Sequence, residues 1–269
     1  MHLHIRHRTV YRYQGPISHA TQIVRMTPRP FAGLRVINWR LKGETRRPLL
    51  ATTDGFDNIL HVHNVQEPKG WTAIFVEGEV ETTDTHGVVG PSHGTLPPPF
   101  FLRTTAQTSP TPALAALARG IPEGSPLDRL HELMSQVRDR IDYRIGVTDV
   151  ATTAARALEL GGGVCQDHAH VFIACARIIG IPARYVSGYL FTGRDDDEDA
   201  SHAWAEAWIE GLGWVGFDPS NRVCPGECYV RTATGLDYWS AAPVRGIWGG
   251  AGRESLEVKV RVEAEQSQQ

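Results

Sequence analysis

Long hydrophobic runs are the first feature that this sequence lacks. No stretch of the 269 residues approaches 18 uninterrupted apolar positions, so we expect no membrane-spanning helix and no membrane partner. The first residues alternate His and Arg with apolar residues, where a secretory signal would need a continuous apolar segment. We therefore expect a cytoplasmic protein.

Cysteine is scarce, and positive and negative charges almost balance. Four cysteines are too few for a disulfide scaffold, so any cysteine with a function must owe it to its chemistry. The formal net charge is −3 and no block of Lys or Arg occurs, which argues against nucleic acid as a partner. Hydrophobic content of 41% and charged content of 21% are typical of a globular protein, and the length allows two domains.

The N-terminal part shows the alternation of apolar and polar residues that is typical of strands. Turn-forming Gly, Pro, Asn and Asp interrupt it, so we predict an N-terminal β-sandwich. The expected strands are 2–13, 34–43, 59–65 and 71–83. Residues 87–112 are rich in Gly, Pro, Ser and Thr, which indicates a linker and a boundary near residue 105. The expected domains are therefore 1–105 and 106–269.

Helical spacing replaces alternation after the linker. Thr111-Pro112 and Ser125-Pro126 are start signals for two helices, and a third helix ends at Gly161. A fourth helix, from Cys165 to Ile179, is apolar almost all round, which is typical of a buried helix. Expected strands follow at 183–191, 201–210, 213–220 and 256–263. Helices followed by antiparallel strands indicate the α+β class.

Three consecutive glycines, Gly161–Gly163, precede Cys165 at the start of the fourth helix. We expect them to permit a sharp turn and to leave space above the sulfur for a substrate. The exposed N–H groups and the dipole of a helix N-terminus favour a thiolate, and they can also bind an oxyanion. Cys165 is therefore the candidate nucleophile.

A cysteine nucleophile needs a base, and the base needs a group that orients it. His202 opens one expected strand and Asp218 closes the next. If the hairpin is centred on Glu210, residues 202 and 218 lie directly opposite each other on one face. A two-residue turn at Gly211 and Leu212 would instead place Asp218 on the wrong face, so that a bulge or a longer loop would be needed.

The segments "GGGVCQDHAHVFIACARIIGIPARYVSGYL" and "SHAWAEAWIEGLGWVGFDPSN" resemble the catalytic core of the transglutaminase-like superfamily, which has a papain-like fold. "VYRYQGPISHATQIVRMTPRP" is similar to the N-terminal β domain of its bacterial members. The resemblance implies a helix-capped antiparallel sheet. It also implies Cys165 as nucleophile, His202 as general base and acid, and Asp218 as the residue that orients His202.

Members of this family either hydrolyse amides or transfer them to amines. We predict hydrolysis of a peptide or protein amide through a thioester on Cys165, without a cofactor or a metal. Transamidation of protein glutamine, which cross-links proteins, and a non-catalytic peptide-binding module are the alternatives.

Other conspicuous residues have structural interpretations. Asp167 complements the helix dipole, and Cys224 and Cys228 are expected to be free thiols because no second ligand pair accompanies them. The acidic run at 195–199 is expected to be a solvated loop, or alternatively a flap that attracts lysine side chains. The His/Arg alternation at 2–8 is expected to be the wet face of an edge strand rather than a metal site.

Overall fold

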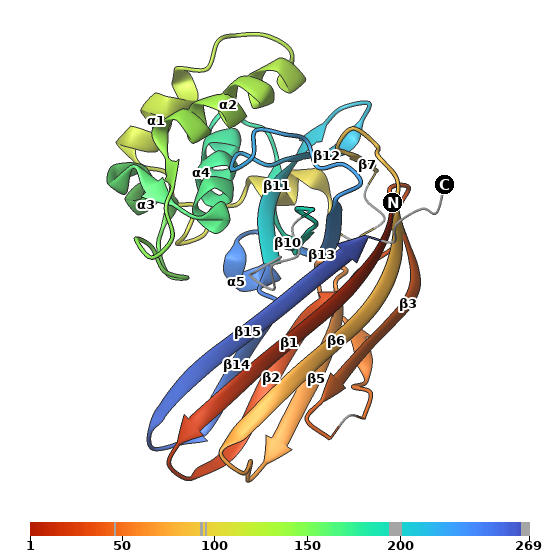
Figure 1. Cartoon of the computed structure of the whole chain (residues 1–269). Coiled ribbons are helices and arrows are strands. Elements are labelled where there is room, and N and C mark those ends of the chain that lie inside the picture. Colours follow the sequence, from red (N-terminus) through yellow and green to blue (C-terminus); the bar gives the residue numbers. More distant parts are fainter. Residues whose placement is uncertain (46, 92–93, 95, 194–200, 265–269) are drawn as a thin grey trace.

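A β-sandwich and a helix-covered sheet make up the molecule (Figure 1). The computed structural model describes residues 1–45, 47–91, 94, 96–193 and 201–264. The acidic run at 195–199 lies outside these residues. The α+β class predicted from the sequence is confirmed.

The sandwich consists of two antiparallel four-stranded sheets. The first has the order β15 (Arg253–Ala264), β1 (His2–Gln14), β6 (Trp71–Thr82), β3 (Leu34–Gly43). The second has the order β14 (Val244–Gly250), β2 (Ile17–Thr27), β5 (Ile59–Gln66), β4 (Ala51–Thr53). Apolar side chains of β2, β3 and β6 meet between the sheets and form the core: Val24, Met26, Leu41, Ile74 and Val76.

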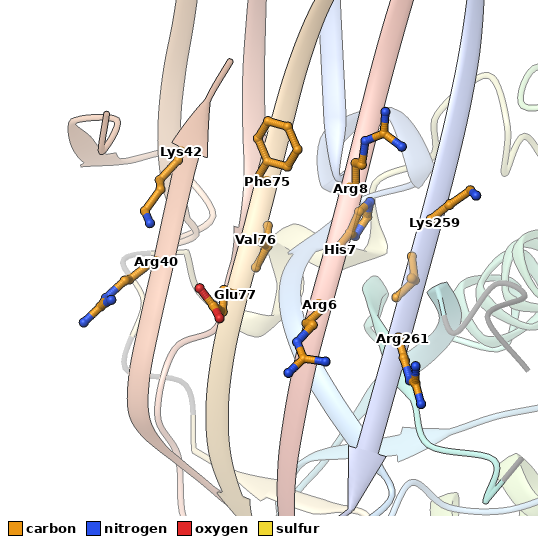
Figure 2. Close-up of a pocket in the computed structure, with 11 residues that line it drawn as sticks. Arg6, His7, Arg8, Arg40, Lys42, Phe75, Val76, Glu77, Lys259 and Arg261 are labelled. Carbon is orange, nitrogen blue, oxygen red and sulfur yellow. The ribbon is translucent and has the colours of Figure 1, made fainter. Parts of the chain in front are cut away.

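Alternation decides which side chains of the first sheet enter the interior. Leu3 and Ile5 are buried, whereas Arg6 and Arg8 point to the outer face. The pairing registers align two cross-strand rows on this face, Arg261–Arg6–Glu77–Arg40 and Lys259–Arg8–Phe75–Lys42. These rows line a shallow hollow of about 400 Å³ (Figure 2). Its lining is mostly basic.

The last two strands belong to the sandwich, which differs from the expected division at residue 105. β15 pairs with β1 along its whole length, and β14 pairs with β2. Residues 106–269 therefore include strands that complete the N-terminal sheets. The pairing also places β1 between β15 and β6, so the prediction that residues 2–8 form an edge strand is wrong.

The expected linker is partly regular structure. β7 (Val88–Gly90) pairs with β12 (Gly213–Phe217) and forms one edge of the sheet that the helices cover. A 3₁₀ helix, η1 (Pro98–Leu102), then packs Phe101 edge-on against Trp214, with ring centroids 5.0 Å apart. This segment therefore adds both a strand and buried aromatic area to the helix-covered part.

The helix-covered part has a five-stranded antiparallel sheet. Its order is β13 (Tyr229–Gly235), β10 (Ala183–Leu190), β11 (Ser201–Ile209), β12 (Gly213–Phe217), β7. The helices are α1 (Pro112–Arg119), α2 (Pro126–Arg140), α3 (Ala154–Leu160), α4 (Cys165–Ile178) and α5 (Tyr238–Ala241). A short parallel pair joins β8 (Asp142–Tyr143) to β9 (Gly162–Gly163).

The helix starts lie at the predicted residues because their caps are local. The hydroxyls of Thr111, Ser125 and Thr153 each accept a backbone N–H of the first turn. α4 is buried over nearly its whole length, between the other helices and β11, as its apolar sequence predicts. It forms the centre of the main core, which also holds Phe172 and Phe217 stacked at 5.3 Å.

β1 connects the two parts of the molecule. Leu3 and Ile5 pack in one apolar cluster with Tyr189 of β10 and Val230 of β13. His7, two residues further along the same face, bonds through Nδ1 to the hydroxyl of Tyr189 at 3.0 Å. Among the described residues, no helix is long and apolar enough to cross a membrane, and the cytoplasmic location stays a prediction.

We expect Leu3→Ala to lower the free energy of unfolding by about 2 to 5 kcal/mol, because Leu3 is fully buried in the junction. Leu50→Ala is the matched control. Leu50 is 90% exposed, so this substitution should change the free energy of unfolding by no more than about 0.5 kcal/mol. Urea unfolding followed by tryptophan fluorescence measures both changes. Equal midpoints for the two variants would show that the junction does not contribute to stability.

Candidate active site

The hairpin between β11 and β12 decides whether His202 and Asp218 share a face. Ile209 pairs with Gly213 and Ala205 with Phe217, so the hairpin is centred on Gly211 and not on Glu210. Continued by one residue, this register places Asp218 beside Trp204. His202 is then a diagonal neighbour of Asp218 on the same face, within reach of a long side chain.

A three-residue connection produces this register. Gly211 and Gly213 both have positive φ, +86° and +85°, which glycine adopts without steric cost. The two-residue turn at Gly211 and Leu212, which would put Asp218 on the wrong face, is therefore not formed. The longer loop that the sequence analysis required is present.

His202 and Asp218 are in direct contact. His202 Nε2 lies 2.7 Å from Asp218 Oδ2, and both side chains are buried. Because Nε2 is bonded to Asp218, Nδ1 is the ring nitrogen available to Cys165. Trp204 stacks on the His202 ring with centroids 6.2 Å apart and planes 25° apart, which restricts the tilt of the imidazole.

The Asp218 carboxylate accepts further hydrogen bonds that hold it in place. Oδ2 accepts from Asn221 Nδ2 at 2.7 Å and from the Tyr229 hydroxyl at 2.8 Å. Oδ1 accepts from the backbone N–H groups of Ser220 and Asn221. Ser220 follows Asp218 at the two-residue spacing of an Asx turn, a signal that the sequence contains, and Asn221 is the next residue. Tyr229 comes from β13, and no local pattern points to it.

The pKa values of the pair shift in opposite directions. Burial alone would raise the pKa of Asp218, but bonds from His202, Tyr229 and Asn221 lower it below its ordinary value. Burial alone would lower the pKa of His202, but the hydrogen bonds and charges of Asp218 and Cys165 raise it to about 10. His202 is therefore an imidazolium at neutral pH, beside Cys165.

The three glycines before Cys165 each have a separate structural reason. Gly161 ends α3 in the left-handed region at φ +58°. A Cβ on Gly162 would collide with the Arg144 guanidinium, and a Cβ on Gly163 would collide with the Asp167 carboxylate. The expectation that the glycines leave space for a substrate is therefore wrong, because protein side chains fill that space.

Asp167 stabilises the first turn of α4. Its Oδ2 accepts from the backbone N–H of Val164 at 2.8 Å and from Thr148 Oγ1 at 2.7 Å. Burial raises the pKa of Asp167, and these two bonds oppose that effect. Asp167 lies in the first turn of α4, where its charge complements the helix dipole as expected, and it also caps the helix, with Thr148 bonded to it from the preceding loop.

A cleft of about 400 Å³ lies in front of Cys165 and His202. One wall belongs to the helix-covered part and includes Gln166, Tyr185 and Ser187. The opposite wall belongs to the sandwich and includes Tyr11 of β1 together with Leu256 and Val258 of β15. No feature of the sequence indicated that the β-sandwich forms part of the candidate site.

All four cysteines are free thiols. Burial raises the pKa of Cys175 to about 12 and also raises the pKa of Cys224 and of Cys228. This agrees with the expectation that Cys224 and Cys228 do not form a disulfide. At neutral pH these three cysteines are therefore mainly thiols, which are weaker nucleophiles than thiolates.

Comparison with known proteins identifies the family. A model of the "Transglutaminase-like superfamily" matches residues 115–219, from α1 to the residue after Asp218. A model of the "Bacterial transglutaminase-like N-terminal region" matches residues 3–81. The chain belongs to the transglutaminase-like superfamily.

The family resemblance extends over the whole chain. The protein ML0607 of Mycobacterium leprae is 30% identical over 270 residues, covering 95% of this chain and 96% of its own length. The protein Rv2569c of Mycobacterium tuberculosis is 31% identical, covering 90% and 86%. A solved structure from Cytophaga hutchinsonii, described as a candidate cysteine protease, has a TM-score of 0.78 at 22% identity. It covers 98% of this chain and 90% of its own, and it shows the same fold.

We expect Asp218→Asn to lower the pKa of His202 well below about 10, because burial is then opposed only by the contribution of Cys165. A titration of the imidazole Cε1–H signals by NMR measures the midpoint. Asp139→Asn, at a partly exposed position on α2, is the matched control and leaves the midpoint unchanged. An unchanged midpoint in Asp218→Asn would contradict the assignment of Asp218 as the partner of His202.

Proposed function

We propose that the protein catalyses cysteine-dependent acyl transfer on amide bonds of a peptide or protein, with water as the acceptor. The supporting observation is the order of three side chains: Cys165 and His202 line the cleft, and the fully buried Asp218 bonds to His202. Cys165 starts a buried helix, and His202 is held by a carboxylate that four other donor groups fix in place. Such an order supplies a nucleophile, a base and an orienting group.

The reaction proceeds in two halves. The Cys165 thiolate attacks the substrate carbonyl carbon, and the resulting oxyanion is stabilised by the Cys165 N–H at the start of α4. His202 then gives its Nδ1 proton to the leaving amine, so that the C–N bond breaks and a thioester remains. In the second half His202 takes a proton from water, which attacks the thioester and releases the carboxylic acid and the thiolate.

The character of the cleft favours water over lysine as the acceptor. No Asp or Glu is among the described residues that line it, whereas a site for a cationic lysine side chain would be expected to include a carboxylate. The lining instead contains aromatic and aliphatic side chains from both walls. This supports hydrolysis by a peptidase or amidase, and it leaves transamidation as an outcome that the experiments below can detect.

We expect iodoacetamide at pH 6.5 to label Cys165 at least about tenfold faster than Cys175, Cys224 and Cys228, whose thiols are protonated there. Peptide mass mapping over time measures the four rates separately. His202→Ala should slow the labelling of Cys165 and of no other cysteine, because it removes the imidazolium beside the Cys165 sulfur. Equal slow labelling of all four cysteines would exclude Cys165 as an activated nucleophile and favour a peptide-binding module.

We expect wild-type protein to cleave members of a peptide library, with a gain of about 18 Da in summed fragment mass from the added water. Cys165→Ala abolishes the change, and Cys224→Ala is the control that retains it. A primary amine is added in a parallel reaction. A loss of about 17 Da from a glutamine peptide, seen only with the amine, would show transamidation instead.

A further inference from the structure

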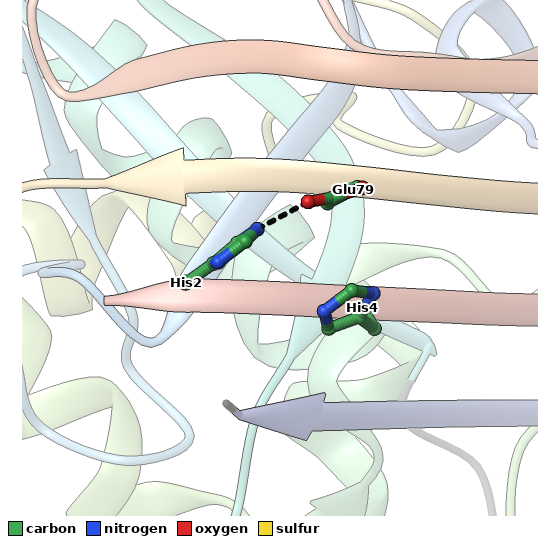
Figure 3. A group of neighbouring side chains, drawn as sticks. All are labelled: His2, His4 and Glu79. Atoms are coloured by element: carbon green, nitrogen blue, oxygen red, sulfur yellow. Dashed lines mark hydrogen bonds and ion pairs between the residues drawn. The ribbon is translucent and has the colours of Figure 1, made fainter. Parts of the chain in front are cut away.

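We propose that His2, His4 and Glu79 form a binding site for a divalent transition-metal ion, with zinc as the best fit. The three side chains gather on the outer face of the first sheet, near the start of β1 (Figure 3). This site is separate from the cleft and independent of the proposed hydrolysis. It also replaces the expectation that the His/Arg alternation at 2–8 holds no metal.

The strand geometry brings the three ligands together. His2 and His4 are two residues apart on β1 and so project from the same face. Glu79 of β6 lies directly opposite His4 in the antiparallel register. The ligand atoms of all three lie within 4.8 Å of one another, and the two imidazole centroids are 5.0 Å apart. These separations place the three ligand atoms around a common point where one ion could lie.

The donor set matches zinc. Two imidazole nitrogens and one carboxylate oxygen are its usual ligands, and a water molecule would complete a tetrahedron. Magnesium and calcium prefer all-oxygen sites, so this set discriminates against them. At present His2 Nε2 bonds to Glu79 Oε1 at 2.7 Å, which orients both groups toward the space between them. Metal binding would exchange this bond for two bonds to the ion.

Three glutamates lie opposite His2 or His4, and we assign Glu79 as the ligand because the other two are bonded to arginines. Glu81, opposite His2, is bonded to Arg35 Nε at 3.0 Å. Glu263, opposite His4 on β15, is paired with Arg261 Nε at 2.8 Å. These two carboxylates are therefore already engaged by guanidinium groups. The side chains of His2 and Glu79 are 26% and 30% exposed, so an ion can enter while the site stays partly shielded from water.

The position of the site gives the metal a structural role. His2 and His4 alternate along β1 with Leu3 and Ile5, whose side chains pack on Tyr189 and Val230. A metal bridge from β1 to β6 would therefore hold the strand that joins the sandwich to the helix-covered part. Binding to the folded state alone stabilises that state, so added zinc should raise the melting temperature.

Cobalt(II) absorption on the full chain, without an added histidine tag, tests the site. We expect a visible ligand-field band that saturates at one ion per chain, without the near-ultraviolet charge-transfer band of a cobalt thiolate. His4→Gln and Glu79→Gln should each remove the band. His86→Gln is the matched control, because His86 is 91% exposed and lies outside the site. Circular dichroism verifies that each variant is folded.

Cys165→Ala distinguishes this site from metal bound at the cleft. If the band persists in His4→Gln, disappears in Cys165→Ala or carries a thiolate transition, the proposal is overturned. Zinc titrated during thermal unfolding gives the second measurement. It should raise the melting temperature of wild type and His86→Gln but not of Glu79→Gln, and equal shifts in all three would also overturn the proposal.

Discussion

The buried negative charge of Asp218 is the constraint on which the candidate site depends. An unpaired carboxylate in the interior would be very costly, so donors from several elements must converge on it. They come from the loop after β12, from β13 and from β11. This convergence fixes the ends of three strands relative to one another. It also makes His202 cationic and directs its second nitrogen toward the start of α4.

Local features of the sequence predicted most of the secondary structure. Helices with Thr or Ser caps followed by Pro begin where expected, since a cap involves only residues three apart. β1, β3, β5 and β6 follow their alternation. β2 and β14 lack so clear a pattern, and their pairing joins segments more than 200 residues apart. No local signal shows which strands will be neighbours, which is why the expected boundary at residue 105 missed the return of β14 and β15.

The candidate site shows the same division between local and distant information. Cys165, His202 and Asp218 stand in recognisable motifs, and the structure brings them together. The predicted hairpin centre, Glu210, was wrong by one residue, and the observed centre is Gly211. The loop length depends on the two positive-φ glycines rather than on strand alternation. The role of the glycines before Cys165 depends on Arg144 and Asp167, whose side chains reach the loop only in the folded state. The contact of Tyr229 with Asp218 was not predicted because Tyr229 lies on another strand, β13.

The wall formed by β15 has a consequence for biosynthesis. Cys165, His202 and Asp218 are all translated before residue 220, whereas Leu256 and Val258 emerge from the ribosome later. A nascent chain can therefore bring these three side chains together while the cleft is still open along one side. Since residues of both parts line the cleft, it is completed when β15 pairs with β1. The order of synthesis thus delays a fully formed cleft until β14 and β15 have joined the two sheets of the sandwich.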